Sequence, residues 1–170
     1  MDETLYKLVF VSFYLLLLIG ISSLIILLIG VLRWKLKKRA FPTRWMRTVI
    51  VLFGVTGVLF YNLQFNLNFL PAGEQNASFP SPNGKYELHT YHFTGMYGKN
   101  AKAVLVNTET SEKNTLYFNW YDYDPQVEWL DNDKVKIGRE KLSIHQDTYD
   151  YRRDPDAFRT LPPQREMHGE

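Results

Sequence analysis

Cysteine is absent from this chain of 170 residues, which excludes a disulfide framework, a thiolate metal site and a cysteine nucleophile. Acidic residues are absent between Glu3 and Glu74, and no charged residue of either sign occurs between Lys7 and Arg33. Charge-free stretches of this length exceed the helices of an ordinary soluble core, so a single soluble domain is excluded. A glycine-rich phosphate loop, a G-x-S-x-G nucleophile elbow and an H-E-x-x-H zinc motif are also missing.

The first apolar segment predicts a transmembrane helix over residues 8–32, preceded by a short N-terminus over residues 1–7. Its 25 uncharged residues would reach about 37 Å as a helix, enough to cross a hydrocarbon core of about 30 Å with some tilt. A cleavable signal peptide is the alternative. It fits less well, because the segment is long and because Asp2 and Glu3 precede it.

A second transmembrane helix is predicted over residues 48–70, with a polar outer end. The segment is apolar as far as Tyr61 and then alternates between amide and apolar side chains, which favours a helix leaving the bilayer but also suits a short strand. Small residues permit close approach of membrane helices, so the two spans should pack as an antiparallel hairpin. The amides are Asn62, Gln64, Asn66 and Asn68, and the glycines are Gly20, Gly30, Gly54 and Gly57.

The loop between the spans, residues 33–47, carries a strong positive charge that predicts the orientation of the chain. Basic residues near the ends of short loops keep those loops in the cytoplasm, so the N-terminus and everything after residue 71 are expected outside, in a multi-pass protein of the cell membrane. General attraction to anionic lipid follows from the same charge, whereas the overall charge of +2 gives no nucleic-acid signal. The predicted topology determinants are Arg33, Lys35, Lys37, Lys38, Arg39, Arg44 and Arg47.

The distal region is expected to comprise a tether over residues 71–80, a small all-β antiparallel domain over 81–153 and a flexible tail over 154–170. Short runs of alternating hydrophobicity separated by turn clusters indicate five or six strands, arranged as a meander or a sandwich. No helical stripe interrupts them. The predicted core is Leu88, Val104, Val106, Leu116, Phe118, Trp120, Val127, Trp129, Val135, Ile137, Leu142 and Ile144.

Three short motifs resemble an uncharacterised family of small membrane-anchored extracytoplasmic domains from Gram-positive bacteria. They are SPNGKY at residues 81–86, VEWLD at 127–131 and DTYDYRR at 147–153. The resemblance implies the compartment and the β character of the domain. It brings no known activity, so it assigns a role to no residue.

The aromatic run at residues 117–123, YFNWYDY, is the most unusual feature of the distal region. If Phe118 and Trp120 point inward, the alternate tyrosines line the opposite face and offer a rigid binding surface for a glycan, a peptide or a partner. The alternatives are a two-layer fold that buries both faces, tyrosines resting at lipid headgroups, and an Arg152 that only pairs with a nearby aspartate. The candidate binding residues are Tyr117, Asn119, Tyr121, Tyr123, Tyr149, Tyr151 and Arg152.

These features favour a non-enzymatic interaction module on a two-helix anchor, binding an envelope protein or a cell-wall component without a cofactor or a metal. One alternative is an envelope hydrolase that uses Glu87, His89 and a distant group such as His145 or Asp147. A second alternative is a small transport or channel subunit lined by the amides of residues 62–68. Acidic residues at 122–133 suggest calcium less well than ordinary turns, since the spacing of a calcium loop is absent.

Overall fold

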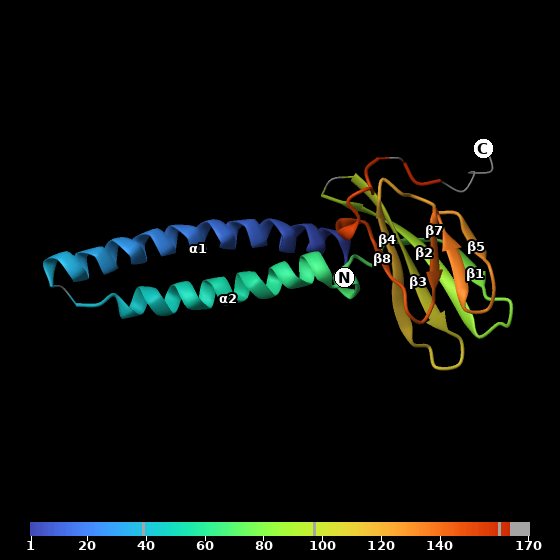
Figure 1. Ribbon diagram of the computed structural model, residues 1–170, viewed down its shortest axis with the longest axis horizontal. Coiled ribbons are helices and arrows are strands. Elements are labelled where there is room, and N and C mark those ends of the chain that lie inside the picture. The colour runs from blue at the N-terminus through green and yellow to red at the C-terminus, as the bar shows by residue number, and fades with distance from the viewer. Residues whose placement is uncertain (39, 97, 160, 164–170) are drawn as a thin grey trace. The chain divides into compact units, whose positions relative to one another are not determined.

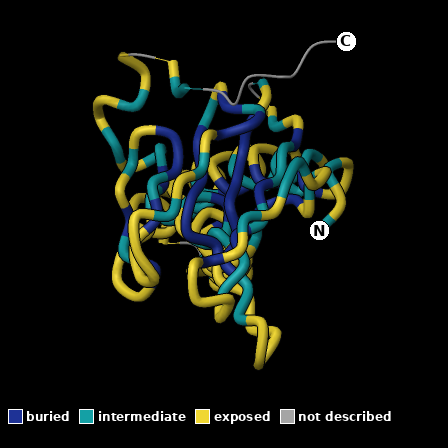
Figure 2. The backbone as a smooth tube through the Cα atoms, turned by 90° about the vertical axis from the view of Figure 1, so that its right-hand side faces the viewer, coloured by how far each residue is buried: buried dark blue, intermediate teal, exposed yellow. Residues whose placement is uncertain are grey.

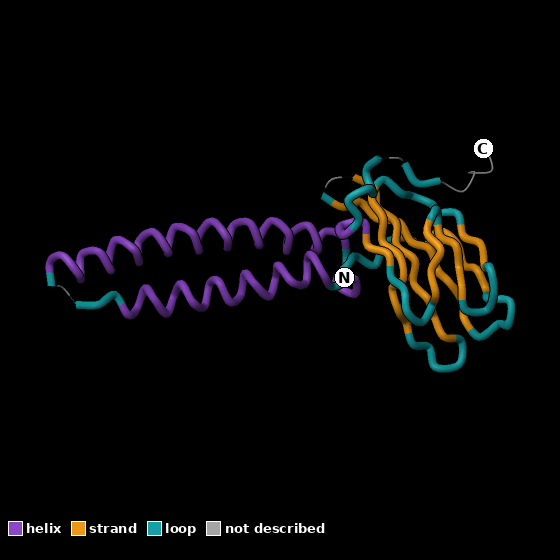
Figure 3. Tube along the Cα trace, in the orientation of Figure 1, coloured by secondary structure: helices purple, strands orange, loops and turns teal. Residues whose placement is uncertain are grey.

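The computed structural model describes residues 1–38, 40–96, 98–159 and 161–163, and it divides the chain into two compact units. One unit, Thr4–Phe69, is helical, and the other comprises mainly the strands from Leu70 onward. Figures 1 and 3 show two long helices in the first unit and mainly strands and loops in the second. The predicted change from helices to a β domain is confirmed.

The helical unit is an antiparallel hairpin of α1 (Glu3–Lys37) and α2 (Thr43–Phe65), followed by a 3₁₀ turn at Leu67–Phe69. Both helices extend into the predicted loop, and the amide-rich segment continues α2 to Phe65 rather than forming a strand. Buried residues recur at intervals of seven on each helix, the spacing of coiled-coil packing. They are Tyr6, Phe13 and Gly20 on α1, and Val49, Thr56 and Leu63 on α2; Ser23 on α1 is buried as well, three residues after Gly20.

The two glycines of α1 lie at close contacts within the hairpin, whereas the two glycines of α2 do not. A Cβ at Gly20 would lie 3.5 Å from the Phe53 ring, and one at Gly30 would lie 3.1 Å from Pro42, so both glycines sit at close contacts. Nothing lies within 4 Å of a Cβ at Gly54 or Gly57. The predicted antiparallel hairpin is therefore present, and its close contacts at glycine lie at Gly20 and Gly30 rather than at Gly54 and Gly57.

Both helices are long and apolar enough to cross a membrane, judged by length and composition. Their outward faces carry large apolar side chains, such as Leu18, 66% exposed, and Val51, 63% exposed. The basic residues of the predicted loop lie at the end of α1, at Lys38 and in the first turns of α2, while Arg39 lies outside the described residues. Cations in the last turn of α1 also complement its helix dipole.

The β unit consists of a five-stranded and a three-stranded sheet (Figure 1). Strand order is β1-β2-β3-β4-β8 in the larger sheet and β5-β6-β7 in the smaller. All pairs are antiparallel except β4 with β8, which is parallel, so the domain is mostly rather than wholly antiparallel. The strands are β1 Glu74–Pro80, β2 Tyr86–Gly95, β3 Gly98–Asn107, β4 Lys113–Trp120, β5 Val127–Trp129, β6 Lys134–Ile137, β7 Glu140–Ser143 and β8 Tyr149–Asp150.

One apolar core joins the two sheets, which makes the domain a two-layer sandwich. Figure 2 shows the buried stretches of the backbone gathered among the strands. Five partly buried side chains pack against this core, namely Phe79, Tyr86, Val127, Trp129 and Tyr149. Its buried members are Leu88, Ala103, Leu105, Leu116, Tyr117, Val135, Ile137, Leu142 and Ile144.

Two predicted loop segments are ordered parts of the domain. The expected tether over residues 71–80 contains β1, whose polar sequence pairs with β2 from Glu74 to Pro80. The expected flexible tail begins with turns at residues 154–159, where Ala157 donates to the Asp154 carbonyl and Arg159 to the Asp156 carbonyl. Residues 164–170 of that tail lie outside the described residues.

A β-bulge in β4 changes which of its side chains face the core. Ala103 pairs with Tyr117 but Val104 pairs with Thr115, so Leu116 is an extra residue in β4. Beyond the bulge Tyr117 enters the core and Phe118 turns to the opposite face, where it stacks on Phe93 at 5.9 Å. Val104 and Phe118 are buried as predicted, at 8% and 3% exposed, but on the second face of the large sheet rather than between the two sheets. Val106 and Trp120 lie on that face as well and are only half-buried, so their core assignment was wrong.

The second face of the large sheet is also buried in part, around a lysine. Lys102 is 9% exposed, donates a hydrogen bond to the Pro71 carbonyl, and lies 5.4 Å from the centroid of the Tyr91 ring. Burial lowers the pKa of Lys102 to about 8. Tyr151 and Arg152 cover Phe118 nearby, each about 5.0 Å from its ring.

Lys102→Met is expected to remove a pH dependence of stability. The folded state releases the lysine proton near pH 8 and the unfolded chain near 10.5, so the unfolded state holds more protons between these values and the native domain gains stability as pH rises. The free energy of unfolding of the wild type should therefore rise by up to about 3 kcal/mol relative to the variant across this window. Thermal melting of the detergent-solubilised protein from pH 7 to 10.5 measures it. Parallel curves for the two proteins would contradict the assignment.

Candidate functional site

A cavity of about 360 Å³ opens between the β4–β8 edge of the large sheet and the start of β7. Its floor is polar although it is buried. Tyr117, with no exposed surface, donates from its hydroxyl to Asp122 Oδ2 at 2.8 Å and accepts from Asn119 Nδ2 at 2.8 Å. Burial, followed by the charge of Asp122, raises the pKa of the Tyr117 hydroxyl, so it stays protonated and keeps donating.

The wall of this cavity is formed by Tyr149 on β8. Its ring stacks on Tyr117 with a centroid separation of 5.4 Å, and its hydroxyl donates to Asp154 Oδ2 at 3.0 Å. Burial and the bonded Asp154 both raise the pKa of Tyr149. The cavity therefore presents a fixed aromatic edge beside a carboxylate.

The rim of the cavity carries charges of both signs. Arg139 donates to the Leu161 carbonyl, which holds the C-terminal segment over the opening, and Arg159 pairs with Asp156 at 3.0 Å. Glu140 lies at the start of β7, where burial and then the nearby Asp154 raise the pKa of its carboxyl. Donors, acceptors and an aromatic ring around one small cavity suit a neutral or zwitterionic polar ligand rather than an apolar one.

Three of the seven predicted binding residues meet in this cavity, but not on an open surface. Tyr117 and Asn119 are buried floor residues, so the expectation that they line an exposed tyrosine face was wrong; the bulge at Leu116 turns them inward. Tyr149 lines the wall. The alternative of a two-layer fold that buries both faces of the aromatic run describes β4 better.

The other four predicted binding residues lie elsewhere. Tyr121 is 58% exposed on the turn after β4, and the Tyr123 ring contacts the His92 ring at a tilt, with centroids 4.0 Å apart, beneath Lys99. Tyr151 packs on Phe118, and Arg152 binds Asp150 through two hydrogen bonds of 2.8 and 2.6 Å. The predicted residues therefore do not form one continuous surface.

The proposed hydrolytic pair is close in space but lacks the expected third member. His89 Nε2 lies 3.1 Å from Glu87 Oε2, and hydrogen bonds from His89 and Ser78 lower the pKa of Glu87. Because Ser78 bonds to the carboxylate and not to the imidazole, His89 is not placed to activate it. His145 contacts Asp133 at 3.3 Å and the Tyr86 ring instead, on the core side of the sheet.

No group of three possible ligands for a metal ion occurs within the part of the chain that the structure describes. The acidic residues that suggested calcium are dispersed. Asp122 is bonded to Tyr117, and Asp131 Oδ1 accepts from the backbone of Asp133 within a turn. This chemistry is that of structural caps and turns.

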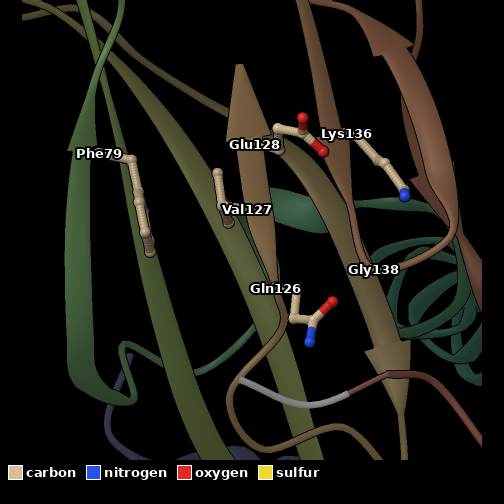
Figure 4. A pocket seen from close by; sticks show the side chains of 6 residues that line it. All are labelled: Phe79, Gln126, Val127, Glu128, Lys136 and Gly138. Atoms are coloured by element: carbon tan, nitrogen blue, oxygen red, sulfur yellow. The ribbon is translucent and has the colours of Figure 1, made fainter. Parts of the chain in front are cut away.

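A second cavity, of about 280 Å³, lies where the edge strand β1 approaches the edge strand β5 (Figure 4). Phe79 from β1 and Val127 from β5 supply its apolar lining, and Glu128 and Lys136 are paired across β5 and β6. Trp129 closes one end by donating from Nε1 to the Phe79 carbonyl at 3.1 Å. This side-chain bridge joins two sheet edges that do not pair through their backbones.

The rim residues of the larger cavity were not predicted from the sequence. Their signal was weak, because each lies in a turn or a short strand and charged residues there are normally solvated. These residues meet only in the folded domain, where the start of β7, the strand β8 and the segment after β8 line the same cavity. The missed residues are Arg139, Glu140, Asp154, Asp156 and Arg159.

Comparison with known protein families finds one match, over residues 38–154, to the family of unknown function DUF5412. The match covers more than half of the chain, including α2 and all eight strands. No curated protein and no solved structure matches the chain.

Glu140→Gln is expected to stabilise the domain at neutral pH. The folded state holds the Glu140 proton to a higher pH than the unfolded chain, whose carboxyl titrates near 4.5, so native stability falls as pH rises through the folded pKa. Gln cannot ionise and removes this loss, which is less than about 1 kcal/mol because the side chain is partly exposed. Melting curves from pH 4 to 7 should converge at the acid end; a lower melting temperature of the variant at pH 7 would refute the assignment.

Proposed function

The chain belongs to DUF5412, a family of unknown function, and we propose that it is a membrane-anchored, non-enzymatic module that binds a polar cell-wall ligand outside the cytoplasm. The α1–α2 hairpin is the anchor in this proposal. The cavity between β4, β8 and β7 is the binding site.

Membrane anchoring is supported by two properties of the hairpin. Its helices are long and apolar enough to span a bilayer, and their outward faces expose large aliphatic side chains that would be unfavourable in water. The orientation is supported by the basic residues between the two spans, which favour a cytoplasmic connection and an outward β domain.

Binding of a glycan is supported by the chemistry of the cavity. Sugars present hydroxyl groups that both donate and accept, together with weakly polar ring faces. Arg139 and Arg159 supply donors, Glu140 and Asp156 supply acceptors, and Tyr149 supplies an aromatic edge held by two contacts. The stacked Tyr149 is the observation that carries the proposal, because a wall fixed in advance loses little entropy on binding.

Arg139→Ala is expected to weaken binding of muramidase-solubilised peptidoglycan fragments about tenfold, the cost of one charge-assisted hydrogen bond. Calorimetric titration of the full chain in nanodiscs measures the affinity. Tyr149→Phe, which removes only the hydroxyl bonded to Asp154, should weaken it as well.

Lys141→Ala is the matched control, because Lys141 is an exposed cation two residues from Arg139 that does not line the cavity. It should leave the affinity unchanged. Equal loss in both variants would indicate nonspecific charge attraction, and the absence of binding to the wild type would reject the glycan as ligand.

Single cysteines test the orientation cleanly, since the chain contains no native cysteine. Lys113→Cys in the β domain should react with a membrane-impermeant maleimide on intact cells, and Lys37→Cys should react only after permeabilisation. Mass spectrometry or a gel shift reads the result. Labelling of position 37 alone on intact cells would reverse the proposed orientation.

A further inference from the structure

One end of the large sheet combines the entry of the chain into the β domain with a group of exposed apolar side chains. The chain enters at Gly73, whose left-handed backbone (φ +73°) brings it against the carbonyl of His92, and Glu74 then pairs with His92. The β2–β3 turn lies at this end, with Met96 42% exposed. Tyr121 follows from β4 and donates its backbone N–H to the Lys99 carbonyl at 2.9 Å.

The C-terminal segment adds further apolar residues to this end. Phe158 packs edge-on against Trp120 at 4.9 Å and remains 62% exposed, and Leu161 is 69% exposed. Trp120 also contacts Tyr121 at 4.6 Å. Together these residues border a shallow cleft of about 130 Å³. We call Met96, Trp120, Tyr121, Phe158 and Leu161 the entry patch.

The connection from the apolar helix determines what this patch can meet. Eight residues separate the end of α2 at Phe65 from β1 at Glu74, and three of them form a 3₁₀ turn. Even if fully extended, these residues would span less than about 30 Å, so the entry end stays near the bilayer surface wherever α2 crosses it. The opposite end of a ten-residue strand lies about 33 Å from the entry end, measured along the strand.

The composition of the entry patch matches the lipid interface. Trp and Tyr favour the headgroup region because their rings are amphipathic, while Met, Phe and Leu favour the acyl boundary. Exposed Lys99 lies beside them and can reach lipid phosphate. We propose that the entry patch contacts the headgroup region of the bilayer that anchors the chain and thereby holds the β domain against the membrane; this inference depends on the membrane anchor of the proposed function.

The test uses the full chain in phosphatidylcholine vesicles in which a fraction of the lipid carries a nitroxide quencher. Single cysteines at Met96→Cys and Arg159→Cys report the entry patch, and Lys113→Cys reports the opposite end of the sheet; each is labelled with the fluorophore NBD. A headgroup nitroxide should quench positions 96 and 159 at least twofold more strongly than position 113. Equal quenching at the three positions would overturn the proposal.

A second experiment disrupts the entry patch and measures the quenching at position 96 again. The double substitution Tyr121→Ser with Phe158→Ser should lower quenching at position 96 by at least twofold. Leu130→Ser, another exposed apolar residue near the far end of the sheet, should not. A blue-shifted signal at position 96 that grows with protein density but is not quenched would assign the patch to a second copy of the chain and overturn the lipid contact.

An internal control separates this proposal from the anchor. Ile25 lies within the charge-free part of α1, and a fluorophore at Ile25→Cys should be quenched by a nitroxide on the acyl chain. Quenching at position 25 without quenching at position 96 would reject the entry patch and leave the anchor intact. No quenching at position 25 would reject the anchor itself.

Discussion

The hydrogen bond between Tyr117 and Asp122 holds together the part of the molecule on which the candidate site depends. A phenol and a carboxylate are both buried there, and each offsets the desolvation of the other. The bond is possible only because the bulge at Leu116 turns Tyr117 toward the core. With Tyr117 in this position, Asn119 donates to the same hydroxyl and the Tyr149 ring stacks on the Tyr117 ring. The local backbone irregularity thus determines the position of the cavity floor.

Much of the architecture was predictable because it depends on patterns of charge and hydrophobicity that extend over many residues. The charge-free runs predicted two helices, and alternating side chains predicted five or six strands where the structure has eight. It was harder to predict which face of each strand points to the core. In β3 both faces are apolar, so Ala103 and Leu105 on one side cannot be told from Val104 and Val106 on the other by periodicity. In β4 a single inserted residue shifts the phase midway, which a period of two cannot reveal.

Strands β1 and β8 escaped prediction for a different reason. β1 is an edge strand with a polar sequence, and it is stabilised by its backbone pairing with β2 rather than by its own side chains. β8 has two residues and pairs in parallel with β4, a partner about thirty residues earlier in the chain. The candidate site is built on such long-range placement. Arg139, Glu140 and Asp154 become neighbours of Tyr149 only after both sheets have assembled.

The segment that follows β8 lies between the polar cavity and the entry patch. Ala157 and Pro162 border both the polar cavity and the shallow apolar cleft, so one stretch of chain presents charged side chains to one and Phe158 to the other. Its described residues, 151–159 and 161–163, form one 3₁₀ turn and otherwise turns and loop, and they are held by Arg139 and by ring contacts of Phe158 to Trp120 and Tyr151. Side-chain contacts of this kind are more easily rearranged than a backbone ladder. A ligand that binds the Arg139 side chain would therefore compete with its hydrogen bond to the Leu161 carbonyl. A surface that binds the Leu161 side chain would pull on the other partner of the same hydrogen bond.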